Sequence, residues 1–289
     1  MRGIIVRALL GSGIVDLLRR MRQRRSVTIL VYHEVGPEVL RRHLGALGKH
    51  YRFLPLREYV RARECGDISS LPEYSLVITL DDGHRSNQEL VEVFREFGVT
   101  PTIFLTSGVI GTRRHFWWKH CADASICAQM KLASNEERLT ALRRNGYSVD
   151  AEYSEAQALD DTAIRNMAPN VDFQSHTVNH PVLTTCEPYE ARAEIAGSKQ
   201  DLESRFGLDV YAFAYPNGSY GEREVTAVRE AGYRCALTVD NGFNDARSDL
   251  YRLKRICIGD ADDVGKMLLK ACGLWQSMKD LTRRNGRAG

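Results

Sequence analysis

Leu76-Val77-Ile78-Thr79-Leu80-Asp81-Asp82-Gly83 decides the fold, because it reads as a buried strand that ends in two carboxylates and a turn. Paired charges at the end of an apolar strand are costly unless a metal ion or a proton relay uses them. Further on, Ser175-His176-Thr177-Val178-Asn179-His180 carries two histidines at a spacing that places both on one face of a helical turn. One aspartate and two histidines suit a catalytic divalent ion, and the second aspartate is then free to act as a base.

Each motif alone has an ordinary explanation. Asp-Asp-Gly is common in turns, and a lone His-x3-His pair often lies on the surface without binding a metal. Here both motifs follow predicted strands, and this combination favours a metal site.

Strand and helix patterns alternate along the chain, which predicts an α/β fold with helices covering a parallel sheet. About seven strands suit an incomplete (β/α) barrel better than an open sheet. The candidate strands are 27–32, 75–80, 101–105, 171–175, 211–215, 235–239 and 255–258. The candidate helices are 38–49, 86–97, 189–206, 221–232 and 262–281. Residues 109–165 break the alternation with a helical pattern near 128–145, and we expect them to form an insertion over one face.

Polar residues follow several of these strands. His33 follows the first strand, the two aspartates follow the second, His176 follows the fourth and Pro216-Asn217-Gly218 follows the fifth. The active site of a parallel barrel gathers at the carboxyl ends of its strands. The sequence therefore predicts one site at this rim.

Composition and charge exclude some classes of protein. The chain has 289 residues, 43% of them hydrophobic and 27% charged, which is ordinary for a soluble globular protein. The net charge of +3 gives no reason to expect a nucleic-acid partner. No run of about 18 apolar residues exists, so a membrane-spanning helix is not expected.

Residues 1–25 carry seven arginines and one aspartate, among apolar residues spaced as in an amphipathic helix. We expect this helix either to contact an anionic membrane or to pack on the domain with a solvated basic face. The seven cysteines include no Cys-x2-Cys pair, and Cys235 and Cys257 lie in strand-like runs that suggest buried thiols. These features favour a reducing, cytoplasmic location, with peripheral contact with the inner membrane as an extension of it.

The three motifs carry a resemblance to a known family. Residues 79–83, 175–180 and 213–218 are similar to the first three motifs of the polysaccharide deacetylases, also called the nodulation-factor deacetylase homology domain or carbohydrate esterase family 4. The resemblance covers residues 26–260, including the insertion 109–165, between the basic helix of 1–25 and a C-terminal helix and basic tail in 261–289. It implies a distorted (β/α) barrel that removes N-acetyl groups from amino sugars.

Carried over by motif, the resemblance implies that Asp82, His176 and His180 hold one divalent metal, Zn²⁺ in the first place, with Co²⁺, Ni²⁺ or Mn²⁺ as substitutes. It implies Asp81 as the general base. The main-chain N–H of Asn217 is then the expected oxyanion donor.

The chain departs from the family pattern at two places. Ala214 stands where an arginine usually steadies the base, and the late histidine that usually supplies the acid is missing. The branch of poly-N-acetylglucosamine deacetylases supplies the acid from a Tyr-His pair, which Tyr32-His33 matches, so His33 is the expected acid. Arg255 is the expected substitute for the missing arginine.

Other residues are expected to contact substrate or support the site. They are Tyr32, Tyr215, Pro216, Arg255, Trp117 and Trp118, and the two tryptophans could instead anchor the insertion. The expected substrate is an N-acetylated glycan or its precursor. A lipid-linked sugar that loses an acetyl or formyl group at the inner membrane is one alternative. A sugar-binding module that has lost catalysis is another.

Overall fold

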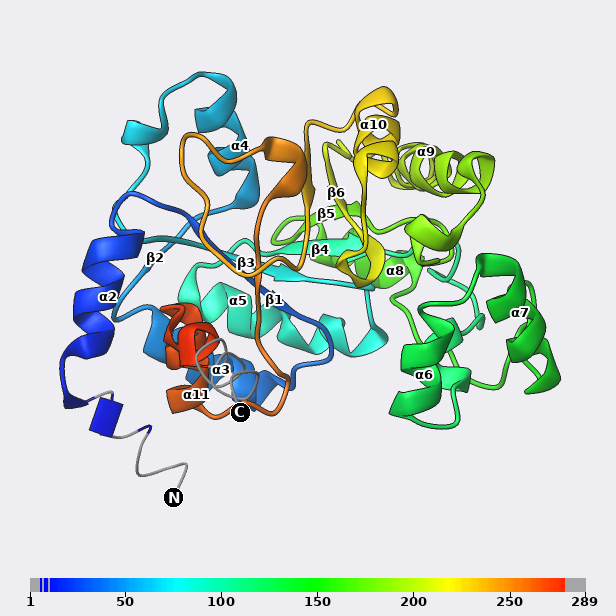
Figure 1. Ribbon diagram of the computed structural model, residues 1–289, viewed down its shortest axis with the longest axis horizontal. Coiled ribbons are helices and arrows are strands. Elements are labelled where there is room, and N and C mark those ends of the chain that lie inside the picture. Colours follow the sequence, from blue (N-terminus) through cyan, green and yellow to red (C-terminus); the bar gives the residue numbers. More distant parts are fainter. Residues whose placement is uncertain (1–5, 7, 10, 279–289) are drawn as a thin grey trace, which may run out of the picture.

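A parallel sheet curls into a distorted half-barrel in this computed structural model, which describes residues 6, 8–9 and 11–278 (Figure 1). The strands lie in the order β7-β6-β5-β4-β3-β1-β8, and β2 pairs with β3 beside this path. All of these pairings are parallel. The strands are β1 (Thr28–Tyr32), β2 (Arg52–Phe53), β3 (Ser75–Leu80), β4 (Thr102–Leu105), β5 (Asp172–Ser175), β6 (Ala212–Ala214), β7 (Cys235–Leu237) and β8 (Ile256–Cys257).

The expected barrel strands are confirmed, and the two-residue β2 was missed because it is too short to carry a pattern. A short segment around residues 253–257 joins the two edges of the sheet. Leu253 forms a parallel bridge with Leu237 of β7, and three residues later Ile256 of β8 pairs with Leu30 of β1. Arg255 lies between these two contacts, so the closure of the barrel also fixes its position.

Helices cover the outer face of the sheet. They are α3 (Pro37–Leu47), α5 (Val91–Phe97), α8 (Asp161–Met167), α9 (Pro188–Phe206), α10 (Glu222–Glu230) and α11 (Val264–Ala271). The helix α4 (Leu56–Glu64) instead packs Leu56, Tyr59 and Val60 against the core inside the barrel. The expected helix over 262–281 is wrong in its extent. Residue Gly273 has a φ of 79°, and this left-handed glycine separates α11 from a second helical stretch at 274–278. Residues 279–281 lie outside the described residues.

The alternation of side chains along the strands sorts them between two cores. Leu76, Ile78 and Leu80 of β3 point toward the outer helices. Val77 points into the barrel, where it packs with residues such as Phe104 and Leu237. Continued by two residues at a time, the inward face of β3 leads from Val77 to Asp81.

The insertion forms its own small core beside the carboxyl ends of the strands (Figure 1). It contains two helices, α6 (Ala124–Met130) and α7 (Asn135–Arg144), where one helical pattern had been expected near 128–145. Its core joins Trp117, Leu142 and Tyr147 to Val182 of the main domain. The insertion is thereby attached to the loop that follows β5.

The N-terminal helix α2 (Ile14–Gln23) packs at the amino end of β1. The Gln23 amide is buried and donates to Thr28 Oγ1 at 2.7 Å and to the Ala271 carbonyl at 2.9 Å. No helix among the described residues is long and apolar enough to cross a membrane. All seven cysteines are free; Cys235 is buried as expected, whereas Cys257 is exposed, which corrects that expectation.

Candidate metal centre and active site

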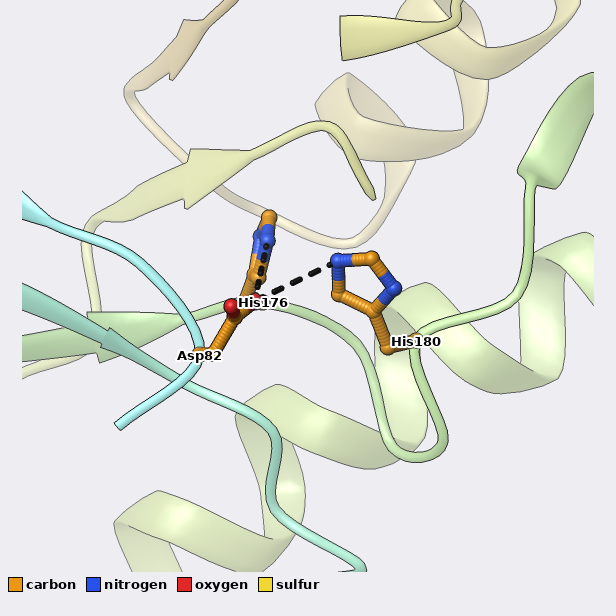
Figure 2. A group of neighbouring side chains, drawn as sticks. All are labelled: Asp82, His176 and His180. Atoms are coloured by element: carbon orange, nitrogen blue, oxygen red, sulfur yellow. Dashed lines mark ion pairs between the residues drawn. The ribbon is translucent and has the colours of Figure 1, made fainter. Parts of the chain in front are cut away.

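Asp82, His176 and His180 converge at the carboxyl ends of β3 and β5 (Figure 2). All three are buried. Asp82 Oδ1 lies 3.5 Å from His176 Nε2 and 3.4 Å from His180 Nε2. Among the described residues, this is the one group of three such side chains whose ligand atoms all lie within 4.8 Å of one another.

The spacing of these atoms fits a divalent ion. Two atoms that ligate one tetrahedral ion at about 2.0–2.1 Å are separated by about 3.4 Å. Burial and the neighbouring His176 lower the pKa of His180 to about 3, so its imidazole is neutral and its lone pair is available. Burial alone would raise the pKa of Asp82, but its hydrogen bond with His84 and the nearby His180 hold that pKa well below its usual range. The donor set therefore suits zinc or a similar ion.

The backbone around these ligands is strained. Five non-glycine residues in the described part of the chain have a positive φ, and four lie in the loops of this site. They are Asp82, Thr177, His180 and Asn217, with φ between 55° and 74°. Such conformations concentrate at functional sites, where the surrounding structure holds them. The expected helical turn at 176–180 is wrong for this reason, since a left-handed residue at 177 and another at 180 make an irregular loop.

Hydrogen bonds orient the His176 ring and hold the loop that carries His180. His176 Nδ1 lies 2.7 Å from the Ala214 carbonyl, which fixes a tautomer with the proton on Nδ1 and leaves Nε2 toward Asp82. The main-chain N–H of His180 donates to Thr177 Oγ1 at 2.9 Å, and the ring Nδ1 of His180 is buried without a hydrogen-bond partner in the described part of the chain. Glu194 of α9 accepts hydrogen bonds from the main-chain N–H groups of residues 178 and 179, so a partly buried carboxylate holds the tip of the loop.

The second carboxylate has a different partner. Asp81 and Arg255 form a fully buried fork, with Nη1 to Oδ1 at 2.7 Å and Nη2 to Oδ2 at 2.8 Å. Arg255 Nε also donates to the Thr238 carbonyl at 2.7 Å, which aims the guanidinium. Burial alone would raise the pKa of Asp81, but Arg255 and the nearby His176 outweigh it and lower that pKa. Asp81 is therefore held ionised beside the candidate metal position, with 3.9 Å between its Oδ2 and His176 Nε2.

His84 is a contact that the sequence analysis missed. Its Nε2 lies 3.0 Å from Asp82 Oδ2, the carboxylate oxygen that does not face His176 and His180. The ring is buried and packs edge-on against Phe116 of the insertion, with 4.9 Å between ring centroids. The signal was present in the sequence, because His84 stands two residues after Asp82.

Tyr32 and His33 lie on opposite faces of the sheet, because successive residues of a strand alternate between its faces. Tyr32 belongs to the outward face of β1, where its hydroxyl lies 3.3 Å from His43 Nδ1, so the structure does not bring it to the site. His33 is next in the chain and half-buried, and it follows the inward-facing Val31 by two residues. Its main-chain N–H donates to Asp260 Oδ1 at 3.3 Å, and Asn87 donates to its carbonyl at 2.9 Å.

The turn after β6 contributes the third motif. Tyr215 is buried, and its hydroxyl donates to the Tyr251 carbonyl at 3.1 Å, so it supports the turn and does not face solvent. Pro216 is also buried, whereas the Asn217 side chain is exposed and donates to Ser219 Oγ at 3.0 Å.

The two tryptophans of the insertion lie against the site in different ways. Trp117 is buried, and its Nε1–H donates to the His180 carbonyl at 2.8 Å, so it anchors the loop. Trp118 is half-exposed, and its ring centroid lies 4.4 Å from that of His180. It also stacks on Phe116, with 4.8 Å between ring centroids, and meets Trp117 edge-on at 5.7 Å. Trp118 is thus the one of the pair that borders both the ligand cluster and solvent.

Comparison with known proteins identifies the family of the chain. A family described as polysaccharide deacetylase matches residues 69–236, which is more than half of the chain. The Bacillus subtilis (strain 168) protein named "Putative polysaccharide deacetylase YxkH" is 24% identical over 185 residues. That match covers 64% of this chain and 51% of the relative, so the chain spans about half the length of that curated protein.

Solved structures share the fold at low sequence identity. The Streptococcus pyogenes deacetylase PplD in complex with acetate has a TM-score of 0.63 and 20% identity, over 85% of this chain and 98% of that one. IcaB from Ammonifex degensii has a TM-score of 0.62 and 17% identity, over 86% of this chain and 97% of that one. At these identities the likeness establishes the barrel fold.

Proposed function

Since the chain belongs to the polysaccharide deacetylase family, we propose that it is a metal-dependent hydrolase that removes N-acetyl groups from amino sugars of a polysaccharide or its precursor. The observation that carries this proposal is that two adjacent carboxylates have different side-chain partners. Asp82 faces two histidines, whereas Asp81 is clamped by Arg255. A ligand and a base are the two roles that amide hydrolysis at a metal centre requires.

Asp82, His176 and His180 would hold the metal, and zinc is the proposed ion because catalytic zinc sites use two histidines and a carboxylate. A divalent ion bound there would supply Lewis-acid activation to the acetamido carbonyl and to the attacking water. Because the His176 and His180 side chains are neutral donors, the three ligands carry a single negative charge and leave the ion electrophilic.

Asp81 is the general base in this proposal. Its carboxylate accepts the proton that the attacking water loses, and the Arg255 fork keeps it ionised and correctly aimed before that step. The main-chain N–H of Asn217 is proposed to donate to the oxygen of the acetyl group as charge develops on it. The left-handed φ of 58° at Asn217 supports this role, since it turns the main chain at the carboxyl end of β6.

His33 is the proposed acid. The bond between carbon and nitrogen breaks as the amine leaves, and an amine leaves poorly unless it is protonated. His33 belongs to the same inward-facing row as Val31 and is half-exposed, so its imidazole can meet a substrate at the rim. The pairing of a base on β3 with an acid on β1 follows from the direct contact between these strands.

Two alternatives have weaker support. A sugar-binding module has no use for a buried carboxylate that an arginine keeps ionised beside a metal position. A lipid-linked sugar was suggested by the basic N-terminus, but α2 lies at the amino end of β1 whereas the candidate site lies at the carboxyl ends of the strands (Figure 1). No observation on the molecule favours either alternative.

Release of acetate from N-acetylglucosamine oligomers tests the proposal. The zinc-loaded protein should release acetate and free amine in equal amounts, and Asp81→Asn should retain zinc while losing about 10²–10⁴-fold in rate. An exposed carboxylate elsewhere, Glu222→Gln, is the matched control and should leave the rate unchanged. Wild-type turnover by Asp81→Asn would show that Asp81 is not the base.

A further inference from the structure

The helix α2 exposes an apolar stripe. Ile14, Leu17 and Met21 are 41%, 51% and 73% exposed, and their spacing of three and four residues places them on one side of the helix. The described part of the chain has six large hydrophobic side chains that are exposed to this degree, and three of them lie on this one helix. Such a concentration marks an interaction surface.

The opposite side of α2 is already occupied, so the stripe cannot turn inward. Gln23 is buried and also accepts a hydrogen bond from the Tyr51 hydroxyl at 3.1 Å. The Arg19 guanidinium donates to the His50 carbonyl at 3.2 Å and lies over the rings of Tyr51 and Tyr74. These contacts fix the rotation of the helix about its axis.

Arginines border the stripe. Arg20, Arg22, Arg24 and Arg25 are all exposed. Of these four, Arg24 is the one with an ion pair in the described part of the chain, to Glu73 at 2.8 Å. Arg20 Nε instead donates to the carbonyl of Asp16, one turn earlier in the helix. The surface is therefore apolar along its centre and cationic at its margin.

The charge distribution selects the occupant. A second copy of α2 is disfavoured as the occupant, because it would bring two groups of arginines together. The C-terminal residues 279–289 are disfavoured as well, because they contain four basic residues and one acidic residue. We propose that α2 docks on an anionic lipid bilayer, with Ile14, Leu17 and Met21 at the acyl boundary and the arginines among the headgroups.

Docking through α2 would set the orientation of the protein. Gln23 contacts Thr28 at the amino end of β1, and His33 lies just past its carboxyl end. Five strand residues span about 17 Å. Figure 1 likewise places α2 and the insertion with α6 and α7 at opposite ends of the molecule. If the proposed function holds, the bound enzyme would present its site away from the bilayer, toward a glycan chain and not toward a lipid headgroup.

Vesicle co-sedimentation of the full-length protein tests the docking. The probes are vesicles of phosphatidylcholine alone and vesicles with 30% phosphatidylglycerol, and the variants are Leu17→Asp, Met21→Asp and Arg20→Glu. Leu132→Asp is the matched control for an apolar position, since Leu132 is 85% exposed in the insertion. Arg247→Glu is the control for charge, because its side chain is 93% exposed elsewhere. Point variants are used in place of a deletion because Gln23 is a buried anchor.

We expect binding to the anionic vesicles only, weakened by salt. One basic residue near an anionic surface is worth about fivefold in affinity, so Arg20→Glu, which changes two charges, should lose roughly 25-fold. Leu17→Asp and Met21→Asp should lose at least as much, while both controls bind as wild type. Equal binding by Leu17→Asp and Leu132→Asp, or no preference for anionic vesicles, would overturn the proposal. Acetate release from soluble oligomers should be unchanged in every α2 variant, so this test and the test of the proposed function fail independently.

Discussion

Replacement of Arg255 by methionine probes how the barrel holds its proposed base. Methionine fills a similar length and carries no charge, so Asp81 would remain buried without its guanidinium. Arg255 is fully buried and makes two short hydrogen bonds to the carboxylate and a third to the Thr238 carbonyl. The change therefore leaves the Asp81 carboxylate buried without a charged partner, and it also removes the contacts that hold this carboxylate in place.

The magnitude follows from these contacts. Removing one partner of a buried ion pair costs about 3–5 kcal/mol in the free energy of unfolding. Two charge-assisted hydrogen bonds at about 1.5–3 kcal/mol each give a similar sum. Neither charge remains in the double variant Asp81→Asn with Arg255→Met. Its loss in the free energy of unfolding should therefore be smaller than the sum of the losses in the two single variants, by at least about 2 kcal/mol. The rate per folded molecule of Arg255→Met should fall at least about 10²-fold, because a general base that is not held in position seldom accepts the proton of the attacking water.

Urea unfolding of the four proteins of this cycle gives the coupling energy, and acetate release under conditions where each variant is folded gives the rate. Arg63→Met is the matched control. Arg63 donates to the carbonyls of Asp245 and Ser248 at 2.9 and 2.8 Å, far from the site, so its loss should lower stability and leave the rate unchanged. Arg255→Lys retains the charge without the fork and should lie between wild type and Arg255→Met. Additive stabilities with an unchanged rate in Arg255→Met would refute the argument that this pair aims the base.

Two further predictions concern contacts of the site, and a third concerns a buried histidine of the outer core. His84→Ala should weaken zinc binding about 10–100-fold in a chelator competition, and His84→Gln, which restores a donor to Asp82 Oδ2, should recover part of it; equal affinity in all three proteins would remove His84 from a positioning role. His33→Ala should lose amide hydrolysis and keep zinc and measurable hydrolysis of an aryl acetate, whose leaving group departs without a proton; equal losses on both substrates would assign the acid elsewhere. Burial lowers the pKa of His43 below 6.5, so the unfolded chain takes up a proton first as the pH falls, and stability should be fully present above about pH 6.5 and decline below it until the folded pKa is reached. His43→Gln should decline less steeply, by up to about 1.4 kcal/mol per pH unit, in urea unfolding between pH 5 and 8, and identical slopes would contradict this.

The barrel and the clustering of its motifs could be predicted because strand ends are local signals. Leu76 to Leu80 form a buried strand whatever surrounds them, and parallel strands present their carboxyl ends at one rim. The meeting of Asp82 with His176 follows from that rule, because both residues come just after strands of the sheet, whereas the position of His180 depends on the loop that carries it.

The contacts that the sequence could not supply are long-range or depend on strained backbone. Glu194 reaches the loop after β5 from a helix that begins eight residues beyond His180, and no periodicity marks it. The loop at 176–180 was expected to be helical because the spacing of its histidines suits a helix, but the positive φ of Thr177 and His180 depends on surrounding contacts such as the hydrogen bond between them. The division between a buried Trp117 and a half-exposed Trp118 likewise depends on how the insertion docks.

The central proposal is metal-dependent release of acetate from an N-acetylated amino sugar, with Asp81 as the general base. The most direct measurement is acetate release from N-acetylglucosamine oligomers by the zinc-free protein, the zinc-loaded protein and zinc-loaded Asp81→Asn, with bound zinc measured in each sample. We expect turnover in the zinc-loaded wild type alone, with zinc retained in Asp81→Asn. Equal turnover with and without bound zinc, or in Asp81→Asn, would contradict the proposed mechanism.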